Sequence, residues 1–240
     1  MKNTDKKIVV VIPSLEPDEA LIEYVDSLLS GYFKSIVVVD DGSSEKFQDI
    51  FSSLEEKEGV DVIHHEVNKG KGRALKTAYE YIRNNYQDVY GIITADSDGQ
   101  HLAKDCYKLA VEMMKGKQGL YLGTRDFNSD NVPFKSRNGN KITSSIFKLF
   151  YGKWLDDTQT GLRGFLNEDL DLMIDIEGER YEYEMQVLID CVRNKVEFIP
   201  VSIETVYIDN NSASHFNPFK DSFKIYKIIF KNFISKHTHR

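Results

Sequence analysis

The predicted architecture rests on one stretch in which a strand gives way to a turn, Ile36-Val37-Val38-Val39-Asp40-Asp41-Gly42-Ser43. A β-branched apolar run, typical of a buried parallel strand, is followed at once by acids and a turn. Ile8–Ile12 is a similar run, and Val60–His64 and Gly91–Ala95 are the next two predicted strands. Segments with apolar residues at helical spacing separate them, at about residues 17–29, 45–58 and 71–84. This alternation predicts βαβ units and an α/β fold with a mostly parallel sheet flanked by helices.

The second half of the chain has a looser pattern. Residues 128–140 are rich in Asn, Ser and Gly and predict a loop. Residues 141–150 and 183–193 predict helices, and residues 196–205 predict a strand pair or an extended segment. No repeat or linker divides the chain, so we expect one main domain over residues 1–214, with residues 215–240 as a C-terminal helix of the same unit.

Composition limits the class of protein. The chain has 240 residues, a net charge of −7 and 41% hydrophobic residues, which are ordinary globular values. Cys106 and Cys191 match no metal or redox spacing and predict buried thiols in a reducing, cytoplasmic compartment. The run Ile8–Ile12 is too short for a signal sequence, and no window approaches the roughly 18 apolar residues of a membrane span.

Charge is concentrated at the C-terminal end. From His215 onward there are six lysine or arginine residues and one acid, whereas the preceding residues are acidic, which argues against nucleic-acid binding. Aromatic residues recur there at helical spacing, with lysines on another stripe, at 219, 223, 226, 230 and 233. Two interpretations are open: a helix that lies on the anionic inner face of the membrane, or one that docks its aromatic face on the domain.

Polar residues follow each predicted strand at the edge where parallel α/β sheets bind ligands. They are the segments Pro13–Pro17, Asp40–Ser44, Asn68–Arg73 and Asp96–His101. Asp96 and Asp98 lie on one side of an extended segment, about 7 Å apart, and suit Mg²⁺ or Mn²⁺ shared with phosphates. The alternative is that this acid pair only forms a turn.

Two other strand ends predict contacts with a nucleotide. The segment Asn68–Arg73 combines glycines, cations and a helix start, which favours anions, although it lacks the P-loop and dinucleotide patterns. A solvated basic turn is the alternative. Asp40 and Asp41 precede a helix cap at Ser43 or Ser44, and we expect one carboxylate to be spare for a base or ribose.

The combined motifs resemble family 2 glycosyltransferases with the GT-A fold, over roughly residues 8–220. The segments that carry this resemblance are Val11–Ser14, Val38–Ser43, Asn68–Gly72, Asp96-Ser97-Asp98 and Gly123–Arg125. Within the family, Asn68–Ala74, Asp98–His101 and Thr160–Phe165 look most like hexosyltransferases that move a sugar from a nucleotide donor to a polyprenyl (undecaprenyl or dolichyl) phosphate. The usual first loop, T-Y-N-E, is replaced by Ser14-Leu15-Glu16-Pro17.

The resemblance implies a donor site for a nucleotide sugar, with a UDP-sugar favoured. Asp96 and Asp98 would hold the metal and diphosphate, with Asp98 the more direct ligand, and His215 would be a further ligand or a structural residue. Glu184 would line the sugar site, or serve only the dipole of a helix start. The other expected donor contacts are Pro13, Ser14, Glu16, Asp40, Asp41, Lys69, Gly70 and Lys71.

Family members invert the anomeric centre, a reaction that normally needs a base when the acceptor is a hydroxyl. Asp157 is the candidate base, or it caps a turn. A lipid phosphate is already anionic and needs cations, for which the candidates are Arg125, Arg137 and Arg163, with ion pairing as the alternative for each. We place Asp98, Asp157 and Arg163 in the catalytic group.

The leading hypothesis is therefore an inverting, metal-dependent transferase acting on polyprenyl phosphate, brought to the membrane by its C-terminal helix or by a membrane-protein partner. Transfer to a glycan or protein hydroxyl in cell-surface polysaccharide synthesis is the alternative. A sugar-phosphate nucleotidyltransferase would need a glycine-rich segment after the first strand, where Pro13–Glu16 has none. A non-catalytic scaffold would be expected to lose Asp96 and Asp98.

Overall fold

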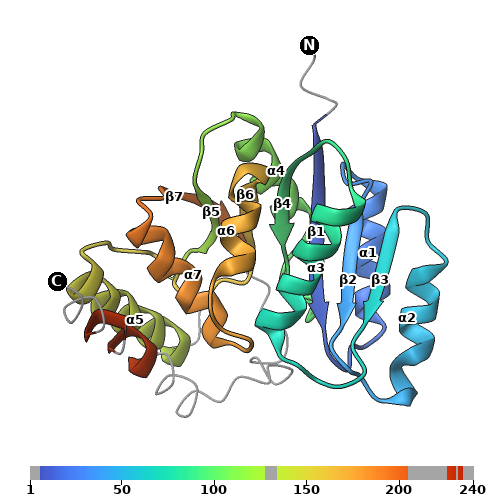
Figure 1. Cartoon of the computed structure of the whole chain (residues 1–240), viewed down its shortest axis with the longest axis horizontal. Helices are drawn as coiled ribbons and strands as arrows, with labels where there is room; N and C mark the ends of the chain where they lie inside the picture. Colours follow the sequence, from blue (N-terminus) through green and yellow to red (C-terminus); the bar gives the residue numbers. More distant parts are fainter. Residues whose placement is uncertain (1–5, 128–133, 205–225, 231, 235–240) are drawn as a thin grey trace.

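The computed structural model describes residues 6–127, 134–204, 226–230 and 232–234 (Figure 1). The described residues form one sheet of seven strands in the order β3-β2-β1-β4-β6-β5-β7, and all strands except β6 run in the same direction. This confirms the predicted mostly parallel sheet. The strands are β1 (Lys7–Ser14), β2 (Ile36–Asp40), β3 (Val60–His64), β4 (Val89–Thr94), β5 (Leu120–Arg125), β6 (Arg163–Leu166) and β7 (Phe198–Ile203).

Helices cover both faces of the sheet (Figure 1). The described α-helices are α1 (Ala20–Ser30), α2 (Gln48–Glu55), α3 (Lys71–Asn85), α4 (Ala103–Met114), α5 (Phe134–Tyr151), α6 (Leu170–Asp175) and α7 (Glu182–Arg193). The predicted loop over 128–140 is wrong from residue 134 onward, because α5 begins there. Its Asn and Gly residues have low helix propensity, and tertiary packing overrides that preference.

The core has two layers, one on each face of the sheet. In β1, Val9 and Val11 belong to one apolar cluster, whereas Val10 and Ile12 belong to the other. The alternation follows from the two-residue period of a strand, and burial on both faces explains why the run is continuously apolar.

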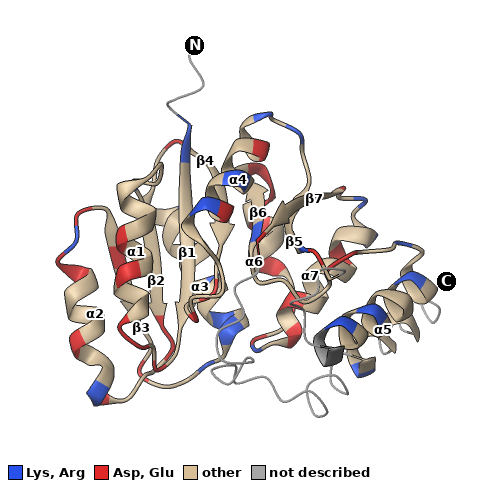
Figure 2. Ribbon diagram, turned by 180° about the vertical axis from the view of Figure 1, so that it is seen from behind, with Lys and Arg blue, Asp and Glu red and all other residues tan. Residues whose placement is uncertain are grey.

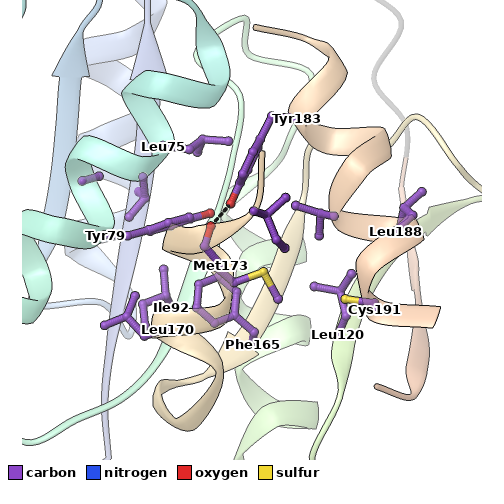
Figure 3. Packing of buried hydrophobic residues seen from close by; sticks show 14 of the residues in the cluster. Leu75, Tyr79, Ile92, Leu120, Phe165, Leu170, Met173, Tyr183, Leu188 and Cys191 are labelled. Carbon is purple, nitrogen blue, oxygen red and sulfur yellow. Dashed lines mark hydrogen bonds between the residues drawn. The ribbon is translucent and has the colours of Figure 1, made fainter. Parts of the chain in front are cut away.

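The first cluster connects the sheet to α3, α6 and α7 (Figure 3). The rings of Tyr79 and Phe165 meet edge to face with centroids 5.4 Å apart. The Tyr183 hydroxyl donates a hydrogen bond of 2.6 Å to the Met173 carbonyl, so its polar atom is satisfied inside the core. This cluster fixes the start of α7 above the centre of the sheet.

Both cysteines are buried and free, as predicted. Burial raises the pKa of each thiol to about 12, first of all because the thiolate would lose its hydration. Neither sulfur is therefore reactive near neutral pH.

The described C-terminal residues, 226–230 and 232–234, are helical and lie against α5 and α7. Ile229 is fully buried, and the ring of Phe150 contacts those of Phe230 and Phe233 at 6.2 and 4.9 Å. The predicted docking of the aromatic face is confirmed for these residues. Within the described part of the chain, no helix has the length and apolar character that a membrane crossing requires.

Candidate active site

The carboxyl ends of β1, β2 and β4 lie next to one another at one edge of the sheet. Ser14 pairs with Asp40 in the β1–β2 register, and Val11 pairs with Thr94 in the β1–β4 register. Acidic residues mark the loops below β1 and β2 (Figure 2). The strand ends that the sequence singled out are therefore brought together, as parallel pairing requires.

Asp40 and Asp41 follow β2 and are buried, with 2% and 4% exposure. Asp40 accepts hydrogen bonds from the Ser43 amide at 2.8 Å and the Gln48 amide group at 3.3 Å, and it bonds to His64 Nδ1 at 2.9 Å. Burial acts to raise the pKa of Asp40, but these hydrogen bonds outweigh burial and lower it. Asp40 thus holds the turn after β2.

Asp41 holds the loop that precedes α3. Its carboxylate accepts the amides of Lys69 at 2.9 Å and Gly70 at 2.8 Å, and it bonds to His65 Nδ1 at 2.7 Å. Gly70 has a φ of 105°, and a Cβ there would lie 2.4 Å from the Glu179 carbonyl oxygen, so only glycine fits. The expectation of a spare carboxylate at this strand end is wrong, since both aspartates make internal bonds; donor contact by either stays a prediction.

Two features at the end of β1 suit a ligand site. The Ser14 side chain is 2% exposed and its hydroxyl makes no hydrogen bond among the described residues. Glu16 is exposed and has a φ of 51°, an uncommon conformation for a residue with a side chain, and its amide donates to Ser43 Oγ at 2.8 Å. Such strain is common at ligand sites. Pro13 is buried at the end of β1.

Asp96 lies beyond β4, with a lysine and a histidine against its carboxylate. Lys71 Nζ is 2.7 Å from Asp96 Oδ1, and His101 Nε2 is 3.2 Å from Asp96 Oδ2. Burial favours the neutral acid, but the charge of Lys71 and the bond from His101 outweigh burial and hold the pKa of Asp96 well below its usual range. Asp96 is therefore a fixed negative charge.

Asp98 has the opposite electrostatic situation. Its one hydrogen bond within the described part of the chain comes from the Gln100 amide at 3.1 Å. Burial and then the charge of Asp96 raise the pKa of Asp98, and together they outweigh the Gln100 amide and the weaker effect of Lys71. The two members of the acid pair thus differ: Asp96 forms an ion pair with Lys71, whereas Asp98 forms none within the described residues.

Lys71 connects the acid pair to α7. Its Nζ also lies 2.8 Å from Glu184 Oε1, in the first turn of that helix. Burial acts to lower the pKa of Lys71, but the charges of Asp96 and Glu184 outweigh burial and raise it. Lys71 is thus a permanent cation at the centre of the site, and Glu184, predicted to line the sugar site, lies beside it.

The rest of the basic segment has structural partners. Arg73 and Lys76 both form ion pairs with Glu179, the latter at 2.8 Å, whereas Lys69 is exposed. The hydrogen bond of Arg73 with Glu179 is the largest reason that the pKa of Glu179 falls to about 2. Within the segment Asn68–Arg73, the groups that stay candidates for binding an anion are therefore Lys69, Lys71 and the backbone amides.

The candidate list from the sequence omitted two residues that contact Asp96. His101 is 7% exposed, and its Nδ1 has no hydrogen-bond partner among the described residues. A Cβ on Gly161 would lie 2.2 Å from Asp96 Oδ2, so no side chain fits there while the carboxylate keeps this position. Both residues stand inside motifs that carry the family resemblance, which is the signal that could have identified them.

Arg163, at the start of β6, is 5% exposed. It donates from Nε to the Thr160 carbonyl at 2.9 Å and from Nη1 to the Glu184 carbonyl at 2.7 Å, while Nη2 has no partner in the described residues. A cavity of about 10 Å³ beside Arg163 and Tyr79 has room for about one water molecule. The described contacts of Arg163 are thus structural, and contact with an acceptor phosphate stays a prediction.

Arg125 and Asp157 form a bidentate pair, with Nε–Oδ2 and Nη2–Oδ1 distances of 2.6 and 2.9 Å. The Asp157 side chain is fully buried and also accepts the Gln159 amide at 3.0 Å. The proposed base is thus engaged by one of the proposed phosphate-binding cations. Arg137 lies near the start of α5 and is partly buried. The functional roles of all three residues stay predictions.

The acid pair is a suitable place for a divalent cation. Asp98 provides a carboxylate with a raised pKa beside the fixed charge of Asp96, and carboxylate oxygens are the hard ligands that Mg²⁺ and Mn²⁺ prefer. No group of three potential ligands gathers in the part of the chain that the structure describes. Water and a diphosphate would therefore complete the coordination, and the predicted ligand His215 lies outside the described residues.

The fold is of the GT-A type, and the acids lie at the edge of its sheet where such folds bind ligands. Glucosyl-3-phosphoglycerate synthase from Mycobacterium tuberculosis, crystallised with Mn²⁺, UDP and phosphoglyceric acid, superposes with a TM-score of 0.69 over 97% of this chain and 79% of that chain. At 15% identity this similarity shows the fold.

Sequence comparison identifies the family. The chain matches the model of Glycosyl transferase family 2 over residues 9–171. An uncharacterized protein from Methanocaldococcus jannaschii is 31% identical over 234 residues, covering 96% of this chain and 92% of that protein. The UDP-N-acetylglucosamine–dolichyl-phosphate N-acetylglucosaminyltransferase of Methanococcus voltae is 30% identical, covering 87% of this chain and 89% of that enzyme. The chain belongs to glycosyl transferase family 2, and it is a glycosyltransferase.

Proposed function

We propose that this enzyme transfers a sugar from a UDP-sugar to a polyprenyl phosphate, with inversion and with Mg²⁺ or Mn²⁺ at the acid pair. The observation that carries the proposal is the asymmetry of Asp96 and Asp98: Lys71 Nζ lies 2.7 Å from Asp96, whereas Asp98 forms no ion pair within the described residues and its pKa is raised. The Mn²⁺ and UDP bound to the mycobacterial synthase, and the lipid phosphate in the name of the methanococcal relative, support the choice of donor and acceptor.

The chain's own residues would hold the donor at the edge of β1 and β2. The unsatisfied hydroxyl of Ser14 and the strained Glu16 provide polar groups for the base and ribose, while Asp40 and Asp41 fix the loops around them. Asp98 would hold the metal. When bound, the metal would offset the charge that develops on the leaving nucleoside diphosphate.

A lipid phosphate acceptor is consistent with the burial of Asp157 and its ion pair with Arg125. A hydroxyl acceptor needs a base within hydrogen-bond reach, but this carboxylate is fully buried and clasped by Arg125. An anionic phosphate needs no proton removed, and it would be attracted to the guanidinium groups of Arg125 and Arg137. We also expect the enzyme to work at the inner face of the cytoplasmic membrane, through its C-terminal residues or a membrane-protein partner.

The test is transfer of labelled sugar into an organic phase. The purified full chain is incubated with Mn²⁺ or Mg²⁺, undecaprenyl or dolichyl phosphate, and a panel of nucleotide sugars. We expect lipid-linked product from one UDP-sugar, lost in Asp98→Ala and kept in the control Asp171→Ala, an exposed acid on α6. Metal-dependent cleavage of a donor without lipid product would contradict the lipid acceptor and favour a glycan or protein hydroxyl.

A further inference from the structure

The outer face of α5 is unusual for a surface helix. Residues 141, 142, 145, 148 and 149 are exposed along one stripe, at spacings that repeat over two turns. Ile142 is 51% exposed and Leu149 is 78% exposed, and Lys141 and Lys148 lie beside them. The opposite face, with Thr143, Ser144 and Phe147, is buried. Helices normally place polar residues outward, so two large aliphatic side chains here require an explanation.

Other exposed apolar residues gather at the same corner. Trp154 follows α5 and is 45% exposed, with Lys148 Nζ 5.9 Å from its ring. Phe230, in the helical C-terminal residues, is 55% exposed while one side of its ring contacts Phe150. Of the nine large apolar side chains exposed among the described residues, five lie on α5, the residues after it, or the C-terminal helix. We call Ile142, Leu149, Trp154 and Phe230 the α5 face.

The charge around the α5 face is positive. Residues 134–155 contain five lysine or arginine residues and no acid, in a chain whose net charge is −7 (Figure 2). The exposed Asp156 follows them and accepts a hydrogen bond of 2.8 Å from Trp154 Nε1, so the positive charge belongs to the helix rather than to the tryptophan end of the face. A basic helix with exposed aliphatic and aromatic residues has the composition of a segment that lies in the interface of an anionic membrane. These cations would attract an anionic surface and would gain nothing from a neutral one.

We propose that the α5 face is a membrane-binding surface that lies on anionic lipid. It extends the expected membrane contact from the C-terminal helix to α5, because the described C-terminal residues use part of their aromatic surface to pack on Phe150. Ile142, Leu149 and Trp154 would enter the headgroup boundary, and Lys141 and Lys148 would contact the lipid phosphates.

This surface is joined to the acceptor side of the site. Asn140 of α5 donates to the Asp156 carbonyl at 2.5 Å and accepts from the Thr158 amide at 3.1 Å. Between those two residues is Asp157, which clasps Arg125. A membrane under α5 would therefore lie against the helix that holds the loop bearing Asp157, the partner of the proposed phosphate-binding arginine. The inference deepens the proposed function, on which this last step rests.

Trp154 is the single tryptophan of the chain, so its fluorescence reports on this surface alone. The full chain is mixed with vesicles of equal parts phosphatidylglycerol and phosphatidylcholine, or of phosphatidylcholine only, and vesicle-bound protein is measured by co-sedimentation. We expect a blue shift of the emission and binding to the anionic vesicles only, weakened by salt. The vesicles contain no polyprenyl phosphate, so this result is independent of whether the acceptor is correct.

The decisive variant is Leu149→Glu, which changes a side chain too exposed to be needed for folding. We expect the binding constant to fall about tenfold, as loss of one buried leucine implies, with a larger fall when Ile142→Glu is added. The control is Val111→Glu, at an exposed apolar position of α4, and it should bind as the original chain does. Unchanged binding in the double variant, or no binding to anionic vesicles, would overturn the proposal. The proposal would also be overturned if the original chain did not bind vesicles but self-associated, and if Leu149→Glu abolished that self-association.

Discussion

Replacing Lys71 by Met tests whether this lysine maintains the charge of the acid pair. The Lys71 ammonium lies 2.7 Å from Asp96 and 2.8 Å from Glu184, and all three side chains are largely buried, with exposures of 18%, 26% and 18%. Methionine keeps much of the volume and removes the charge. In the variant, the carboxylates of Asp96 and Glu184 would no longer share a cation. Asp96 would keep only its contact with His101.

The cost follows from leaving a charge without its partner. Breaking a buried ion pair on one side typically costs about 3–5 kcal/mol, and partial hydration of Asp96 reduces this, so we expect about 2–4 kcal/mol at neutral pH. Lys76→Met is the matched control on the same helix. Lys76 pairs with Glu179 at 2.8 Å, but Glu179 keeps Arg73, so we expect the control to lose only about 1–2 kcal/mol.

The dependence on pH gives the sharper test. In the original chain the pKa of Asp96 is lowered, so its contribution to stability is present above the unfolded value of about 4 and is lost below it. Without Lys71, burial and the charge of Glu184 would raise the pKa of Asp96. As the pH falls, Asp96 would become protonated, and the destabilisation caused by its unpaired charge would decrease. The stability difference between the two proteins should therefore be largest near pH 7 and should narrow toward about pH 4.5.

Urea unfolding followed by circular dichroism at several pH values measures this difference. A double variant with Asp96→Asn added should recover part of the loss, since the unpaired charge is then gone. The reasoning would be refuted if Lys71→Met cost no more than Lys76→Met, if the difference did not change with pH, or if the effects of the two substitutions simply added.

Three further predictions concern the same site. Gly161→Ala should lower stability by about 1–3 kcal/mol in thermal unfolding, because a Cβ would meet Asp96, whereas Gly139→Ala, with open space around it, should not destabilise. Asp98→Asn should keep the fold, become more stable by up to about 1 kcal/mol at neutral pH because its raised pKa reflects an unfavourable charge, and lose Mn²⁺–UDP binding in calorimetry. Arg125→Lys cannot reproduce the bidentate clasp on Asp157 and should cost about 1.5–3 kcal/mol in urea unfolding; an unchanged midpoint would contradict a structural role for the pair.

The sequence predicts the first four strands and an extended segment at β7, and it misses two strands, β5 and β6. The predicted run Ile36–Val39 is observed within β2 (Ile36–Asp40), because β-branched residues buried on both faces leave a clear pattern. β6 is only four residues long, begins with a buried arginine and runs antiparallel between β4 and β5. Its pairing depends on strands about 40 and 70 residues earlier in the chain, and no local pattern encodes such contacts.

In the site, too, the sequence predicts the positions of residues but not the contacts that depend on distant parts of the chain. Strand ends place Asp40, Asp41 and Asp96 at one edge, which the sequence predicts from topology alone. What each carboxylate does depends on partners that folding supplies: Asp41 is occupied by amides 28 and 29 residues away, and Asp96 by the lysine at the start of α3. A chemically identical residue is therefore either a loop anchor or a site residue according to contacts that spacing does not reveal.

The two members of the acid pair illustrate why that distinction matters for mechanism. Lys71 and His101 compensate Asp96 within the protein, so a divalent cation would gain less there than at Asp98, where the neighbouring charge of Asp96 is a cost until a cation arrives. Asp96 then acts through its position, linked by Lys71 to Glu184 and α7. We therefore expect an entering metal to bind mainly at Asp98. Asp96 would instead hold α7 next to the edge of the sheet, through Lys71 and Glu184.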